Sequence, residues 1–244
     1  MCGFEKAIKI YNFELSTEQD NIDLSTINFS KSASPLKLLL ESYEHINMIY
    51  SICFSSCENY LVSGSIKTCK VICVNIADKV NFGKLLYTYN HIESVETVKF
   101  SPYDQVISDG YPLFVSGCLG NFLIVHKMQA DLTFKVVINK TLKMSIRSVS
   151  FSPCARELVV GGTSNNANTS VVVIIIISLY AKHDSSLFTG EIIYELKDII
   201  NDCNLNHIEF IQKTTIIFGG DNKVNILKVN NVDNQNKEIG RAHV

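Results

Sequence analysis

This chain of 244 residues has few charged residues, and it has no apolar run long enough to span a membrane as a helix. Charged residues make up only 19% of the sequence and the formal net charge is −2, so no basic field exists to hold nucleic acid or an anionic membrane. The longest apolar run covers residues 171–180, which is half of the roughly twenty residues that a membrane-spanning helix needs. Its β-branched residues instead predict a strand that is buried on both faces.

No secretory signal precedes the eight cysteines, so we expect free thiols in a reducing compartment and a cytoplasmic or nuclear location. Cys53, Cys57, Cys69 and Cys73 could form a four-thiolate zinc site. Zinc knuckles, however, favour two intervening residues on a tight turn, whereas three residues separate each of these pairs and most of the four lie in predicted strands. The spacing favours small core hydrophobes, and we expect no metal and no cofactor.

A short pattern recurs along the chain: a Phe, usually followed by Ser, precedes a doublet of small residues by about ten to sixteen positions. The copies are Phe54-Ser55 with Ser63-Gly64, Phe100-Ser101 with Ser116-Gly117, Phe151-Ser152 with Gly161-Gly162, and Phe210 with Gly219-Gly220. Repetition at this period indicates one supersecondary unit used several times, each too small to bury its own apolar face.

Each unit is predicted to contain four strands separated by Gly, Asn, Asp, Ser and Pro turns. The expected strands are 48–54, 59–65, 68–76 and 84–90; then 94–101, 111–118, 121–127 and 133–143; then 146–152, 156–163, 169–180 and 190–197. Two insertions, 104–111 and 181–189, should lie at the sheet rims. Apolar first strands and polar fourth strands favour sheets packed face to face around an axis, although a Greek-key sandwich is an alternative.

The repeats resemble those of the WD-repeat β-propeller family. Residues 94–102 and 145–153 are similar to the first strand and turn of that family. His45 and His91 stand where the family often has a histidine before the first strand, Ser63 and Ser116 match a serine of its second strand, and Asp221 lies in a matching turn. The resemblance implies an all-β, partial propeller of about four to five blades, each of four antiparallel strands.

The sequence also departs from the family pattern. The chain has no tryptophan, so the family's Trp-Asp dipeptide is missing everywhere. It is replaced by Tyr11-Asn12, Val74-Asn75, His126-Lys127 and Leu227-Lys228. The hydrogen-bonded network of His, Ser, Asp and Trp is therefore incomplete in every repeat, and we expect the blades to rely on apolar packing.

The repeats divide the chain into blade pieces at about 1–44, 45–90, 91–143, 144–197 and 204–229, followed by a polar tail at 230–237. Both ends look cut, and we expect the natural protein to be longer. Residues 238–244 can be encoded by codons that resemble a common short-read sequencing adapter, so we expect this peptide to be an artefact. No fourth strand is expected after the strand at 223–229.

A propeller is a rigid scaffold whose function lies in its loops, so the resemblance implies a non-catalytic protein–protein interaction scaffold within a multi-protein complex. Asn47, Glu93 and Arg147 are candidate partner contacts. The alternative is a phosphoinositide-binding propeller acting at membranes, but its paired-arginine motif is missing because Arg147 and Arg156 stand alone. An enzyme is a third possibility, which no clustering of histidines with acids supports. No nucleic acid is expected as a partner.

Overall fold

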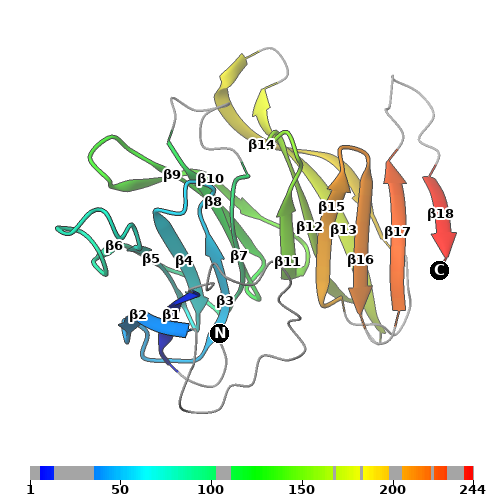
Figure 1. The fold of residues 1–244 in the computed structure, drawn as a ribbon. Coiled ribbons are helices and arrows are strands. Elements are labelled where there is room, and N and C mark those ends of the chain that lie inside the picture. The colour runs from blue at the N-terminus through cyan, green and yellow to red at the C-terminus, as the bar shows by residue number, and fades with distance from the viewer. Residues whose placement is uncertain are drawn as a thin grey trace, which may run out of the picture.

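Every regular element in the described part of the chain is a β-strand. In the computed structural model these described residues are 6–13, 36–102, 111–166, 169–181, 184–197, 205–220, 223–229 and 239–243. The strands form five antiparallel sheets in chain order, one of two strands and four of four strands, as Figure 1 shows. The all-β, propeller-like fold predicted from the repeat is therefore confirmed.

Strands that follow one another in sequence are neighbours in each sheet. The first sheet holds β1 (Ile8–Phe13) and β2 (Leu36–Ser42). The second holds β3 (Ile49–Phe54), β4 (Tyr60–Ser65), β5 (Thr68–Cys73) and β6 (Leu85–Asn90). The third holds β7 (Val95–Phe100), β8 (Leu113–Cys118), β9 (Phe122–Met128) and β10 (Phe134–Thr141). The fourth holds β11 (Ser145–Phe151), β12 (Glu157–Asn166), β13 (Thr169–Ala181) and β14 (Asp184–Leu196). The fifth holds β15 (His207–Gln212), β16 (Thr215–Gly220), β17 (Lys223–Val229) and β18 (Ile239–His243).

The first strands of the four-stranded sheets lie beside one another, β3 against β7, β7 against β11, and β11 against β15. Side-chain hydroxyls join them: Val98 N donates to Ser51 Oγ at 3.1 Å, and Ile208 N donates to Ser148 Oγ at 3.1 Å. This contact between inner strands is the radial arrangement of a propeller, and it excludes the Greek-key sandwich.

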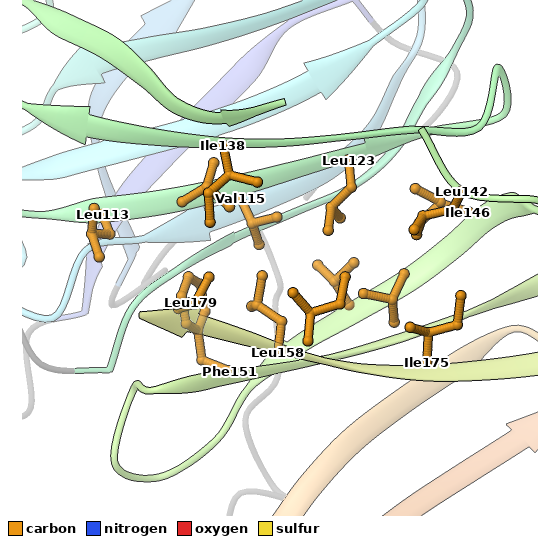
Figure 2. Packing of buried hydrophobic residues seen from close by; sticks show 14 of the residues in the cluster. Leu113, Val115, Leu123, Ile138, Leu142, Ile146, Phe151, Leu158, Ile175 and Leu179 are labelled. Atoms are coloured by element: carbon orange, nitrogen blue, oxygen red, sulfur yellow. The ribbon is translucent and has the colours of Figure 1, made fainter. Parts of the chain in front are cut away.

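Apolar side chains fill the spaces between successive sheets. Figure 2 shows the cluster between the third and fourth sheets, where Val115 and Leu123 face Leu158 and Ile175. Strand β13 serves two such cores, as the β-branched run predicted. Alternate residues of β13 belong to different clusters: Val173, Ile175 and Ile177 pack toward the third sheet, whereas Val172, Ile174 and Ile176 pack toward the fifth.

The small-residue doublets mark the closest approach between neighbouring sheets. A Cβ placed on Gly117 would lie 2.5 Å from Ile146 Cγ2 of the next sheet. Equivalent atoms on Gly64 and Gly161 would lie 2.9 Å from side-chain carbons of Val95 and Leu205. Because real Cβ atoms do not approach so closely, only glycine permits this packing distance.

Strand β14 begins earlier than predicted, at Asp184 rather than about 190, so residues of the predicted rim loop 181–189 extend the β13–β14 hairpin. The hairpin reaches the third sheet. Lys140 Nζ of β10 donates to Gly190 O at 2.6 Å, and Lys127 Nζ lies 6.0 Å from the centre of the Phe188 ring. The second predicted insertion lies almost wholly outside the described residues, at 103–110.

The expectation that no fourth strand follows β17 is wrong. Residues 239–243 pair antiparallel with residues 225–229 as β18. The physical reason is that β17 would otherwise be an edge strand, and its unpaired N–H and C=O groups form a template for any extended segment within reach. This pairing does not bear on the origin of the last seven codons.

Candidate functional site

A buried histidine anchors the loop that leads into the second sheet. His45 Nε2 lies 2.7 Å from Ser63 Oγ of β4, and His45 Nδ1 lies 3.4 Å from Thr68 Oγ1 of β5. Burial, with a smaller contribution from the charge of Lys70, lowers the pKa of His45 from 6.5 to about 4. The imidazole is therefore neutral at pH 7, and its hydrogen bonds hold the loop before β3 against the sheet.

The third sheet repeats this anchor and extends it. His91 Nε2 lies 2.9 Å from Ser116 Oγ, which lies 3.0 Å from His126 Nε2. On its other side, His126 Nδ1 is 3.3 Å from the hydroxyl of Tyr87 on the second sheet. His126 stands where the family has its tryptophan, and its ring stacks on Phe114 at 4.2 Å. The network lacks its Asp and Trp as expected, but this blade does not rely on apolar packing alone, because an imidazole supplies the bond that an indole N–H would make.

The fourth sheet replaces the same positions with apolar residues. Leu142 precedes Ile146 by the interval that separates His91 from Val95, and Val160 pairs with Val149 as Ser116 pairs with Val98. The residue at the His126 position is Ile177, and all three replacements, Leu142, Val160 and Ile177, belong to one core cluster. The second sheet has both kinds of residue, with His45, Ser63 and Ile72 at these positions. The residue at the tryptophan position of this sheet is therefore Ile72 and not Val74, as the sequence had suggested. The three positions that His91, Ser116 and His126 occupy in the third sheet are therefore polar in one sheet and apolar in another.

Cys69 of β5 brings a thiol to the histidine pair across the gap between the second and third sheets. Its Sγ atom and one ring nitrogen each of His91 and His126 all lie within 4.8 Å of one another, and all three residues are buried. Tyr89 packs edge-on against both imidazole rings. Reasoning from spacing within one repeat could not find this cluster, because its members come from two sheets.

The Cys69 cluster carries no charge at neutral pH. Burial lowers the pKa of His91 to about 4, and burial together with His91 lowers the pKa of His126 well below its usual range. Burial raises the pKa of the Cys69 thiol to about 12, against a small opposing effect of its hydrogen bond with Ser116. A thiol with this pKa is not a thiolate at pH 7, so the cluster is not an activated nucleophile and base.

The anchored loops expose apolar side chains beside the predicted contact residues. Ile46 follows His45 and is 80% exposed, and Ile92 follows His91 and is 60% exposed. Two positions after each histidine, Asn47 is half-buried and Glu93 is exposed. Antiparallel strand order places both loops at the same end of their sheets, and His91 N donates to Lys67 O of the adjacent β4–β5 turn at 2.8 Å.

Arg147 lies in a different setting from the other two predicted contacts. It occupies the register shift of β11 between Ile146 and Ser148, where a β-bulge points it away from the regular pleat. Its Nη1 atom forms an ion pair of 3.3 Å with Glu96 Oε2, and Glu96 occupies the matching shift in β7. Arg147 therefore joins two sheets. Asp221, the remaining predicted position, lies outside the described residues.

Comparison with known proteins agrees with this geometry. The WD domain, G-beta repeat family matches residues 37–72, which run from β2 to β5. No curated protein matches the chain. Among solved structures, the Cps50 (Swd1) beta-propeller domain of Myceliophteria thermophila matches with a TM-score of 0.60 and 13% identity, over 84% of this chain and 61% of that one. The chain therefore spans about three fifths of the length of that domain. The matched repeat and the shared fold support a divergent WD-repeat β-propeller.

Proposed function

We propose that this chain is a non-catalytic interaction scaffold in a multi-protein complex of the cytoplasm or nucleus. The observation that carries the proposal is the pair of exposed isoleucines, Ile46 and Ile92, on histidine-anchored loops at one end of adjacent sheets. WD-repeat propellers generally mediate protein interactions, and this surface has the properties that such a role needs.

The buried histidines prepare these loops for binding. His45 and His91 each bond to a serine of the second strand of their sheet, so the loop backbone is fixed before a partner arrives. A fixed loop loses less conformational entropy on binding, and an exposed apolar side chain on it supplies area that a partner can bury. Asn47 and Glu93 border the isoleucines and could supply the polar rim of such a contact.

Membrane phosphoinositide binding is less well supported. Arg147 is already paired with Glu96, and Arg156 follows the far end of β11, so the two arginines lie at opposite ends of one strand. They could not grip one head group together. No helix in the described residues has the length and hydropathy needed to cross a membrane.

The test is a comparison of copurifying proteins between two matched variants. Ile46→Asp with Ile92→Asp places charge on the proposed contact surface. Val80→Asp places charge on an apolar residue that is at least as exposed, at 86%, and that lies at the opposite end of the second sheet. Partners that are retained by the Val80 variant and lost from the double variant support the proposal. If both variants retain stoichiometric partners, the surface around Ile46 and Ile92 is not where those partners bind. Binding of the protein to liposomes would favour the phosphoinositide alternative.

A further inference from the structure

We propose that Cys69, His91 and His126 form a binding site for a soft monovalent metal ion, of which Cu(I) is the biological example, between the second and third sheets. The three donors come from β5, from the loop before β7, and from β9. They meet in a cluster that neither the repeat pattern nor the matched family assigns.

The cluster offers three donor atoms to one ion. The donor atoms lie within 4.8 Å of one another, and Ser116 Oγ sits between the two imidazoles, 2.9 Å from His91 Nε2 and 3.0 Å from His126 Nε2. Metal–nitrogen and metal–sulfur bonds of roughly 2.0–2.3 Å require the donors to close inward by less than about 1 Å. The Ser116 hydroxyl must turn aside as they do. It is therefore the group that competes with the ion for the centre.

Tyr87 completes the outer contacts of the site. With His126 Nε2 on the metal, Nδ1 carries the ring proton and donates to the Tyr87 hydroxyl oxygen, which lies 3.3 Å away. A ligating histidine commonly has such a partner on its other nitrogen, because the partner fixes the tautomer and the ring orientation. Stacking on Phe114 restricts the same ring further.

Charge selects a monovalent ion. The cluster lies in an apolar core that includes Val62, Val98 and Phe100. A thiolate and a monovalent cation sum to zero charge, whereas a divalent ion would leave one uncompensated positive charge in this core. Thiolate and imidazole donors also suit Cu(I). On binding, the Cys69 S–H bond breaks, the S–metal bond forms, and one proton passes to the solvent. No electron is transferred.

The neighbouring anchor provides an internal control. His45 and Ser63 reproduce the bond of His91 and Ser116, but Ile72 stands at the position of His126 and supplies no second imidazole. A His45→Leu variant should therefore leave metal binding unchanged while removing one buried histidine. Cys118→Ala similarly removes a buried thiol that is not among the three donors.

The experiment titrates the reduced full chain with Cu(I) without oxygen, against a coloured Cu(I) chelator. Cys69→Ala should weaken binding by at least about tenfold, and the two control variants should match the wild type. Ser116→Ala should bind as tightly as the wild type or more tightly, because the competing hydroxyl is gone. Equal affinity in Cys69→Ala and the wild type would overturn the proposal, as would loss of binding in Ser116→Ala with retained fold.

X-ray absorption on the wild type keeps the proposal testable if Cys69→Ala does not fold. One equivalent of Cu(I) should show one sulfur and two nitrogen neighbours. A shell of sulfur alone would place the ion on other thiols, and a shell without sulfur would exclude Cys69. Either result would overturn the site.

Discussion

The His45 anchor predicts a measurable acid sensitivity, which an apolar replacement should remove. The fourth sheet has Leu142 and Val160 where the second sheet has His45 and Ser63, and both sheets have isoleucine at the third position. The double variant His45→Leu with Ser63→Val therefore gives the second sheet the arrangement that the fourth sheet already uses. Because the buried His45 and Ser63 are replaced together, and the contact of Thr68 Oγ1 that is lost without replacement is a longer one, we expect its stability at pH 7 to stay within about 1 kcal/mol of the wild type.

The magnitude follows from the pKa of His45, which burial lowers from 6.5 to about 4 in the folded protein. Between these values the unfolded chain binds a proton that the folded chain does not, so the folded state loses stability as the pH falls. The contribution is complete above about pH 6.5, and about 2 kcal/mol of it is lost between about pH 7 and about pH 5. The double variant should lack this part of the loss.

Urea unfolding at the two pH values measures the difference directly. The single variant Ser63→Val should be the least stable at pH 7, by about 1–3 kcal/mol, because it leaves the buried His45 Nε2 without its partner. His207→Gln, which removes an exposed histidine, is the control. If the double variant loses as much stability as the wild type between the two pH values, the buried imidazole does not carry the acid sensitivity and the reasoning fails.

Three further outcomes are expected. Gly117→Ala should destabilise the fold by about 1–3 kcal/mol, because its Cβ would lie 2.5 Å from Ile146 Cγ2. Gly120→Ala should destabilise it less, because the new Cβ would meet the exposed side chain of Ile92. Equal losses of stability in urea unfolding would contradict this. Arg147→Ala should cost less than about 1 kcal/mol because its ion pair with Glu96 is partly exposed, and a larger loss would show that the pair is essential to sheet packing. Iodoacetamide should modify the exposed Cys57 in the native protein, and Cys69 only after unfolding, because Cys69 is buried and its pKa is raised to about 12. Mass spectrometry of native and unfolded samples shows which of the two cysteines is alkylated in each.

Strand positions were largely predictable because apolar alternation and turn residues are local signals. The strand predicted at 111–118 is observed as Leu113–Cys118, and the strand predicted at 121–127 is observed as Phe122–Met128. The long hairpin of β13 and β14 was underestimated, because the segment 184–189 has no apolar alternation to mark it. Strand β18 was missed because an exposed edge, rather than its own sequence, determines its pairing.

The polar network was only half predictable. His91 and Ser116 follow from their positions in the repeat, and the structure places them 2.9 Å apart. His126 was noted only as a departure from Trp-Asp, although a ring nitrogen can occupy the place of an indole nitrogen. Cys69 and Tyr87 could not be found in this way, since contacts between sheets depend on how sheets pack and not on spacing within one repeat.

The reach of the β13–β14 hairpin to β10 changes how the third and fourth sheets can move. If the third and fourth sheets were in contact only through their inner strands, β7 and β11, their outer strands could move apart. The Lys140 to Gly190 hydrogen bond and the Phe188 contact fasten the outer edge as well. Separating the two sheets then requires the inner and the outer contacts to break together. The amide hydrogens of both sheets should therefore exchange with solvent as one cooperative unit.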